Sequence, residues 1–413
     1  MRILHLSNLY APVIGGLERS IATSGEEMVR RGHEITVLTL ATPAAPHDET
    51  INGVRVIRVR SVNSLMPGMN RDPGKPFHPT TADPLATAEI ARVLRGGDFE
   101  LVHSHDWLMY SYLPLHRTPL GLPHVHTAHD FGLTCVRKTF ARGGRRCDGP
   151  SLARCVPCAS AQYGTPKSAL LTAALRAQRH RGIDCLTAIS RSVGEALEYA
   201  RLPGDLPVQV ISSLVPDGLD ALARATPRPQ WLPERPYLLF VGQLGPHKGI
   251  DVLFDAYEKL CADWPGPDDP PRLVCLGTRR EDTPPIPDGV LLRTDVPHPQ
   301  VMSAWHHAAA GVVPSLLEGM GQVAVEAMLA GAPLIASASG GLLDVVREDG
   351  VHGLLIPPGD AGALHGALRR VLTDPELAAR LRAGGHRRGL EFTAAHVVPQ
   401  IEEVYRACIA AAH

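Results

Sequence analysis

The chain has 413 residues, of which 44% are apolar, and its formal net charge is −1. This composition is typical of a soluble globular protein and argues against a disordered chain, a collagen-like repeat or a coiled coil. The balanced charge excludes a whole-chain basic surface for nucleic acid. At about 150 residues per domain, the length predicts two or three domains.

The sequence contains neither a signal peptide nor a membrane span that we can identify. Residues 1–10 are too few and too polar for a signal peptide. The most apolar stretch, residues 327–343, is interrupted by Gly331 and Pro333, and no run reaches about 18 apolar residues. We therefore expect a cytoplasmic protein, with peripheral contact at the inner membrane face and the oligomeric state left open.

The first half of the chain alternates between strand and helix patterns. An apolar run begins at Arg2, a glycine-containing loop follows over residues 8–16, and a helical pattern then ends near Gly32. A strand over residues 35–40 completes a β–loop–α–β unit, which indicates a parallel doubly wound sheet. Further strands are predicted at residues 54–59, 101–103, 125–128, 186–189 and 208–211.

The second half repeats the alternation after a proline-rich segment, residues 226–236, that we interpret as a linker. Strands are predicted at residues 237–241, 273–276, 311–313, 333–336 and 353–356, with a helix over residues 250–262, and helices alone over residues 360–372, 375–388 and 393–411. The pattern predicts an α/β fold with two such domains, residues 1–220 and 221–390, and a ligand cleft between them. Residues 391–413 are expected to pack back on the first domain.

Two segments interrupt the alternation. Residues 63–84 are rich in proline, glycine and polar residues and are expected to form a long loop, and long loops in compact domains are often functional. Residues 131–164 form a second irregular insertion in the first domain, and four of the eight cysteines lie within it.

Glycine and lysine mark the turns after the first strand of each domain. Gly15 and Gly16 allow backbone N–H groups to approach an anion at a helix N-terminus, although a tight turn without a ligand explains them as well. Lys248 follows the strand that ends at Val241, where open α/β sheets bind ligands. A fixed cation there would neutralise a leaving diphosphate, whereas the alternative is a solvated loop lysine.

Carboxylates and histidines form two further motifs. Glu318 precedes a glycine-rich turn, and Glu326 lies eight residues after Glu318 in a predicted helix. Both carboxylates could then accept hydrogen bonds from sugar or ribose hydroxyls. The alternative is a surface helix with two exposed acids. His129 ends one predicted strand, while His103 and His105 end another. A histidine at such a position can face the cleft, although a structural histidine is the commoner role.

Together these segments resemble the retaining GT-B glycosyltransferases of family 4, the nucleotide-sugar-dependent group 1 transferases. The resemblance covers most of the chain: the Gly15–Gly16 loop, the strand ended by His129, the segment V-G-x-L-x-x-x-K-G, and Glu-x7-Glu with Gly340–Gly341 behind it. It implies the GT-B fold, in which two Rossmann-like doubly wound parallel-sheet domains face a central cleft.

The family also implies a role for each matching residue. Lys248 would bind the diphosphate, His129 a hydroxyl of the donor sugar, and Gly16 the diphosphate or the acceptor. Glu318 and the amides of Gly319, Met320 and Gly321 would hold the sugar, and Glu326 the ribose. Gln243 would lie on the donor side, and Gly15 and His105 on the acceptor side.

The implied reaction moves a hexosyl or N-acetylhexosaminyl group from a UDP-sugar, with retention, to a hydroxyl of a small molecule, lipid or glycan. The donor phosphate would take the acceptor's proton, and no metal or other cofactor would be required. Gln243 and Met320 depart from the family, which usually has arginine and commonly phenylalanine there, so one expected diphosphate cation is missing or supplied elsewhere. The alternatives are a nucleotide-sugar epimerase of similar architecture and a zinc-containing binding module.

The cysteines of the insertion suggest a structural zinc ion. Cys135, Cys147, Cys155 and Cys158 have the spacing C-x11-C-x7-C-x2-C, and the final pair is the usual half of a tetrahedral zinc site. Free thiols, or disulfides under oxidising conditions, are the alternatives. The surroundings are basic, which would suit an anionic acceptor or a membrane surface, although a solvated basic face is the commoner arrangement.

Overall fold

The computed structural model describes residues 1–13, 15–43, 45–62, 75–76, 78–142, 145–202, 206–266 and 268–412. The chain divides into two compact units. The first contains Met1–Arg142, Arg146–Leu214 and the C-terminal segment from Ala394, and the second is built from Val215–Thr393. Most of the expected loop over residues 63–84 lies outside the described residues.

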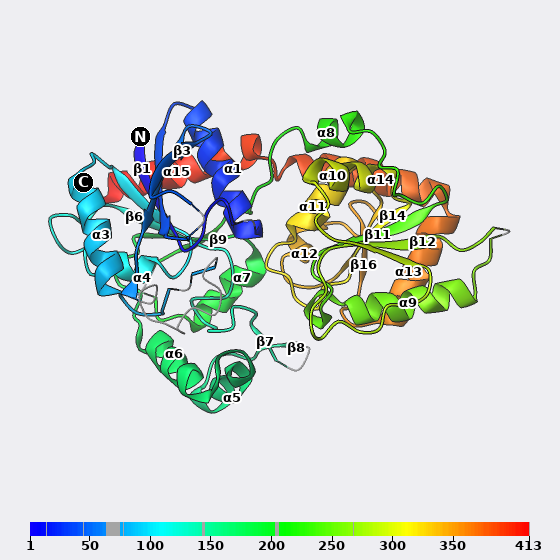
Figure 1. The fold of residues 1–413 in the computed structure, drawn as a ribbon, viewed down its shortest axis with the longest axis horizontal. Helices are drawn as coiled ribbons and strands as arrows, with labels where there is room; N and C mark the ends of the chain where they lie inside the picture. Colours follow the sequence, from blue (N-terminus) through cyan, green and yellow to red (C-terminus); the bar gives the residue numbers. More distant parts are fainter. Residues whose placement is uncertain are drawn as a thin grey trace. The chain divides into compact units, whose positions relative to one another are not determined.

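The first unit is built on an eight-stranded sheet (Figure 1). All neighbouring strands are parallel except β3, which is antiparallel to β4. Their spatial order is β10 (Val208–Val210), β9 (Cys185–Ala188), β6 (His124–Ala128), β5 (Leu101–Ser104), β1 (Arg2–Ser7), β2 (Glu34–Leu40), β4 (Val54–Val59) and β3 (Asp48–Ile51). A separate ribbon pairs β7 (Ala141–Arg142) with β8 (Arg145–Arg146).

The helices of this unit cover both faces of the sheet, as the period of two along each strand requires. Ile3 of β1 packs with α1 and α15, whereas the next residue, Leu4, packs with α3 on the opposite face. The described helices are α1 (Gly16–Arg30), α3 (Pro84–Arg95), α4 (Met109–Tyr112), α5 (Leu152–Tyr163), α6 (Thr165–Ala177), α7 (Arg191–Ala196), the 3-10 helix η1 (Leu197–Tyr199) and α15 (Ala394–Ala412).

The second unit has a six-stranded sheet in which every neighbouring pair is parallel. Its order is β13 (Val290–Arg293), β12 (Arg272–Leu276), β11 (Tyr237–Val241), β14 (Ala310–Val313), β15 (Leu334–Ser337) and β16 (Leu354–Ile356). Numbered within the unit, this is the order 3-2-1-4-5-6 of a Rossmann sheet. The parallel α/β architecture predicted from the alternation of strands and helices is therefore confirmed.

Helices also cover both faces of this second sheet. Leu253 of α9 and Leu364 of α13 join the core on the face that includes Val312, whereas a Cβ built on Gly311 would meet Trp305 of α10 on the other face. The helices are α8 (Leu219–Ala225), η2 (Pro246–Lys248), α9 (Ile250–Ala262), α10 (His298–His307), α11 (Gln322–Ala330), α12 (Leu342–Val345), α13 (Ala361–Thr373) and α14 (Pro375–Leu390).

Two expectations about the organisation of the chain are wrong. The proline-rich segment 226–236 does not join the units, because it lies inside the second one, where Leu232 is buried and the Trp231 indole N–H donates to Gln300. The insertion 131–164 is not irregular throughout, because α5 occupies its second half. The signal for this helix was Ser151, whose side chain accepts a hydrogen bond from the Arg154 backbone N–H as an N-cap.

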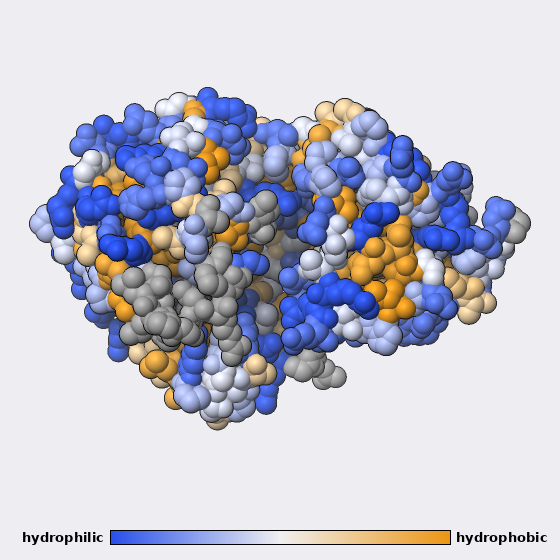
Figure 2. All heavy atoms as spheres, in the orientation of Figure 1, coloured by the Kyte–Doolittle hydropathy of each residue, from blue (hydrophilic) through white to orange (hydrophobic). Residues whose placement is uncertain are grey.

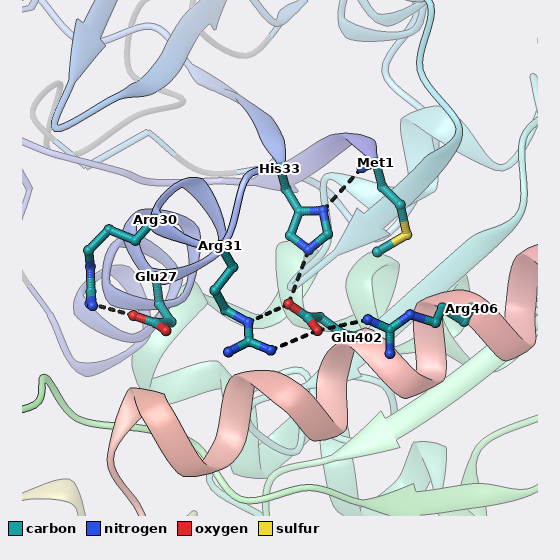
Figure 3. A network of polar contacts seen from close by, with 7 residues as sticks. All are labelled: Met1, Glu27, Arg30, Arg31, His33, Glu402 and Arg406. Carbon is teal, nitrogen blue, oxygen red and sulfur yellow. Dashed lines mark hydrogen bonds and ion pairs between the residues drawn. The ribbon is translucent and has the colours of Figure 1, made fainter.

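The C-terminal helix α15 is joined to the end of α1 by an ion-pair network around one buried carboxylate (Figure 3). The Glu402 carboxylate, only 3% exposed, accepts hydrogen bonds from Arg31 Nε at 2.6 Å and Arg406 Nη2 at 3.0 Å, and it lies 3.0 Å from His33 Nε2. The hydrogen bonds from Arg31, and then those from His33, lower the pKa of Glu402 to about 2 although its burial opposes this.

We expect Glu402→Gln to destabilise the protein by about 1–3 kcal/mol at neutral pH, since it weakens the charge-assisted hydrogen bonds that this buried carboxylate accepts from Arg31 and Arg406. The native pKa lies below the ordinary value of 4.5, so the contribution is complete above that pH and is lost as the pH falls toward 2. Urea unfolding of both proteins at a series of pH values measures this. The matched control is Glu403→Gln on the exposed face of the same helix. A difference from the unchanged protein that stays constant down to pH 3 would contradict the linkage.

Among the described residues, none of the helices combines the length and the apolar character that crossing a bilayer requires. On the face shown in Figure 2, hydrophilic side chains predominate and apolar ones gather in patches among them.

Candidate functional site

The topology of the second unit identifies the edge of its sheet at which a ligand is expected. The chain leaves β11 toward β12 and leaves β14 in the other direction toward β15, so the order of the sheet reverses between these two neighbours. Ligands of open α/β sheets bind outside the carboxyl ends of the strands at such a switch point. The segments that follow β11 and β14 carry Lys248 and Glu318, which the sequence had singled out.

Lys248 and Glu318 form an ion pair at this switch point. Lys248 Nζ donates to Glu318 Oε2 at 2.6 Å, and Ser315 Oγ donates to the same oxygen at 3.1 Å. Gly249 makes this approach possible, because its φ is 68° and a Cβ there would lie 2.0 Å from the Pro314 carbonyl oxygen. Among the described residues, two of the three ammonium protons of Lys248 have no acceptor, and Glu318 Oε1 has no donor. Both groups can therefore bind a ligand.

The turn after Glu318 is held by glycines from the next strand's loop. The Gly341 N–H donates to the Glu318 carbonyl oxygen at 2.9 Å. A Cβ on Gly340 would lie 2.1 Å from that oxygen, and one on Gly341 would lie 2.3 Å from the Gly319 carbonyl oxygen. The close packing explains why the chain has Ser-Gly-Gly after β15.

The turn leads directly into α11, which carries Glu326. Gly321 is the N-cap of this helix with φ of 93°, and no side chain caps the helix. Met320 and Glu326 are both buried. Glu326 lies about one helical turn beyond the N-terminus of α11, and its Oε1 is 3.1 Å from Nε2 of His298. Sequence reasoning did not identify His298, because it begins a different helix, α10.

Gln243, which stands where the family usually has an arginine, is exposed. A basic side chain other than Lys248 lies nearby and comes from the segment after another strand. A Cβ on Gly245 would lie 2.7 Å from Cδ of Arg280, which follows β12 and forms an ion pair with Asp282. Burial, and then the charges of Lys248 and Arg280, lower the pKa of His247. The charges of Glu318 and Asp282 oppose this effect, because each carboxylate forms an ion pair with one of the two cations that lie at this end of the second unit.

The first unit has its own switch point, between β1 and β5. Gly15 is the N-cap of α1 and Gly16 its first residue, and no side chain caps the helix. The loop after β1 is fixed to the end of β5, because the Asn8 N–H donates to Asp106 Oδ2 at 2.6 Å. Burial raises the pKa of Asp106 to about 6.

His129 follows β6 in the same unit and contacts His105, which follows β5. His129 Nε2 lies 3.0 Å from His105 Nδ1, and His105 Nε2 lies 2.9 Å from His5 Nδ1. The expected direct contact between His105 and an acceptor is therefore not supported, because this ring is buried and both its nitrogens are engaged. His129 keeps Nδ1 without a partner among the described residues. Burial lowers its pKa to about 3.

Other histidines near this cluster have structural roles. His103 bonds Tyr405 and Thr127 at 2.6 and 2.7 Å, and His126 on the opposite face bonds Ser104. Beside the cluster lies a cavity of about 30 Å³, lined in part by His103, His105 and His129, with room for ordered water.

The described part of the chain does not assemble the expected zinc site. Among the described residues, three or more ligand atoms of this kind come within 4.8 Å of one another only at His5, His103 and His105, whose hydrogen bonds are described above. Cys135, Cys147, Cys155 and Cys158 form no such group and are free thiols. Cys158 accepts from Arg137 and Cys155 from the Ser151 backbone. The geometry thus does not support zinc at these cysteines, and elemental analysis of protein purified without added zinc tests the prediction.

Comparisons with known proteins identify the family of this chain. The family profile "Glyco_transf_4: Glycosyltransferase Family 4" matches residues 14–215, and "Glycosyl transferases group 1" matches residues 225–388. A D-inositol 3-phosphate glycosyltransferase of Frankia alni is 31% identical over 327 residues, covering 74% of each chain. The chain belongs to glycosyltransferase family 4. Another such enzyme, of Acidothermus cellulolyticus, is 28% identical and matches 99% of this chain and 90% of its own length.

Solved structures of this family's fold extend over the whole chain. Sucrose-phosphate synthase of Thermosynechococcus elongatus has a TM-score of 0.73 at 23% identity, with 99% of each chain covered. Anabaena Alr3699/HepE, solved in complex with UDP-glucose, has a TM-score of 0.68 at 17% identity and covers 98% of this chain and 100% of its own. This member of glycosyltransferase family 4 therefore has the GT-B fold expected from its sequence.

Proposed function

We propose that this glycosyltransferase moves a hexosyl or N-acetylhexosaminyl group from a UDP-sugar to an acceptor hydroxyl with retention of the anomeric configuration. The observation that carries the proposal is the Lys248–Glu318 pair at the switch point of the second unit, with Glu326 on the helix that follows. A cation for a diphosphate and two carboxylates for hydroxyls are what a nucleotide sugar requires.

Each residue has one role in this proposal. Lys248 binds the diphosphate through its free ammonium protons, and Glu318 Oε1 accepts from a sugar hydroxyl while the Gly319, Met320 and Gly321 amides face the sugar. Glu326 accepts from the ribose hydroxyls, and Gln243 lies beside the donor. On the first unit, His129 bonds a sugar hydroxyl, and the Gly15–Gly16 turn contacts the diphosphate side or the acceptor.

The chemical step exchanges one oxygen for another at the anomeric carbon. The bond from this carbon to the β-phosphate oxygen breaks, and a bond to the acceptor oxygen forms. The acceptor's proton passes to the departing diphosphate, so atoms and charge balance without a protein nucleophile. Lys248 stabilises the charge that develops on the diphosphate, which is the kind of fixed electrostatic stabilisation that contributes most to many enzymes.

The names of related proteins support the choice of substrates. Several structures with this fold contain UDP, UDP-glucose or UDP-2-fluoro glucose, whereas a starch synthase with this fold contains ADP. The relatives that match nearly the whole chain are named for transfer to D-inositol 3-phosphate. We therefore take UDP-hexoses as the first donors to test and a phosphorylated cyclic polyol as the first acceptor.

A panel of nucleotide sugars tests the proposal. Thermal unfolding and release of nucleoside diphosphate are measured with UDP-, GDP- and ADP-sugars, each with and without inositol phosphates. At one hundred times its Kd, the true donor should stabilise the protein by about 2.7 kcal/mol. An epimerase would convert the donor without any acceptor, and a binding module would neither convert nor hydrolyse it. Either result would overturn the proposal.

A further inference from the structure

Three histidines from neighbouring strands of the first unit form one line of hydrogen bonds. His5 of β1 contacts His105 at 2.9 Å, and His105 contacts His129 at 3.0 Å. His5 is 0% exposed and His105 is 5% exposed. Burial lowers the pKa of all three rings, so each is neutral at physiological pH and carries a single proton.

Two proton arrangements satisfy this line. In one, His5 Nδ1–H donates to His105 Nε2 and His105 Nδ1–H donates to His129 Nε2, which leaves the proton of His129 on Nδ1. In the other, every bond is reversed, His129 donates inward from Nε2, and its Nδ1 is a bare acceptor. Because each neutral ring has one donor and one acceptor, the choice at one end fixes the whole line.

The buried end of the line decides between them. His5 Nε2 has no hydrogen-bond partner among the described residues and is inaccessible to solvent. The reversed arrangement would place a proton on this atom and leave an N–H unsatisfied in the core. The first arrangement leaves only an unused lone pair, and orphaned buried donors are rarer than under-satisfied acceptors.

We propose that His105 and His5 are positioning residues that fix the proton of His129 on Nδ1, so that His129 presents a neutral N–H donor to an oxygen of the substrate. His129 Nδ1 has no partner among the residues the structure describes, so it is available for this bond. The identity of the oxygen as a sugar hydroxyl rests on the proposed function, whereas the position of the proton does not.

A neutral donor suits the chemistry of glycosyl transfer. Positive charge develops at the anomeric carbon in an oxocarbenium-like transition state. A histidinium near that carbon would oppose this charge, whereas a neutral N–H holds a hydroxyl oxygen without adding a charge. The line of buried histidines provides such a donor, because its rings remain neutral and their orientation is fixed by hydrogen bonds.

The position of the proton is measured directly by NMR. Long-range ¹H–¹⁵N spectra of protein labelled at histidine nitrogens distinguish the two neutral tautomers, and the signals that vanish in His129→Gln assign this ring among the 20 histidines. We expect the Nδ1–H tautomer in the unchanged, ligand-free protein. A His129 that carries its proton on Nε2, or that is an even mixture, overturns the proposal whatever the enzyme's substrate.

Two variants of His105 test the positioning role in catalysis. His105→Phe removes the hydrogen bonds to His5 and His129 and should leave the tautomers of His129 mixed. We expect kcat/KM to fall about 10-fold, the effect of losing the one hydrogen bond from His129 to the substrate. His105→Asn keeps an N–H near the Nδ1 position and should recover most of that loss. UDP affinity should not change in either variant.

The matched control is His78→Gln, since His78 is equally buried in the first unit but bonds Pro79 and Ser111 instead. Equal losses in kcat/KM for the Phe, Asn and control variants would show that the histidines only fill the core, and would overturn the positioning role. If no donor and acceptor pair reacts with the unchanged protein, the proposed function fails while the NMR result still decides the position of the proton.

Discussion

Lys248→Ala is expected to lower turnover about 10²–10³-fold at saturating donor, because it removes the fixed cation that stabilises the leaving diphosphate. The structure adds a second reason. Without its partner at 2.6 Å, the Glu318 carboxylate would face the donor's negative diphosphate without compensation. Steady-state kinetics with the donor identified by the panel measures the effect.

The control for this variant is Lys259→Ala. Lys259 lies on α9 of the same unit, is exposed, and pairs with Asp255 one helical turn away. Its removal should change turnover less than twofold, as expected for a surface ion pair. The double change Lys248→Ala with Glu318→Gln separates the two reasons, because it also removes the uncompensated carboxylate. A loss below threefold in Lys248→Ala would show that Lys248 is an ordinary loop residue.

Glu326→Ala should weaken UDP binding about 10–100-fold, since it removes a buried carboxylate acceptor from the ribose hydroxyls. Glu318→Ala should leave UDP affinity within a few-fold of normal and reduce turnover and discrimination between donor sugars. UDP has a ribose and a diphosphate but no sugar, so titration calorimetry with UDP alone distinguishes the two carboxylates.

His298 complicates this prediction and supplies its control. Its Nε2 lies 3.1 Å from Glu326, so Glu326→Ala also removes a partner of a partly exposed ring. His298→Ala leaves the carboxylate in place and should reduce UDP affinity far less. Equal losses of UDP affinity for the two glutamate variants would contradict the separate roles of these carboxylates.

The sequence alone determined the fold class, the family and the positions of the groups after the strands. Parallel strands that are buried on both faces have short apolar runs in their sequence, and glycines mark the turns that follow them. The strands β1 and β11 and the helices α1 and α9 were therefore predictable from local sequence pattern. Lys248 was found because it follows a predicted strand, and Glu318 because it precedes a glycine-rich turn eight residues ahead of Glu326. The Rossmann order of the second sheet brings them together.

The tertiary structure alone decided which side chains become partners. His5 and His105 are 100 residues apart, and their contact depends on the register between β1 and β5, which no local pattern specifies. For the same reason, the expected contact of His105 with an acceptor was replaced by a buried line of histidines. Cysteine spacing did not decide whether the sulfurs meet, and proline content did not separate a linker from a packed segment. Local composition indicates which secondary structure a segment prefers, whereas the set of residues around a ligand and the boundaries of domains depend on contacts between distant residues.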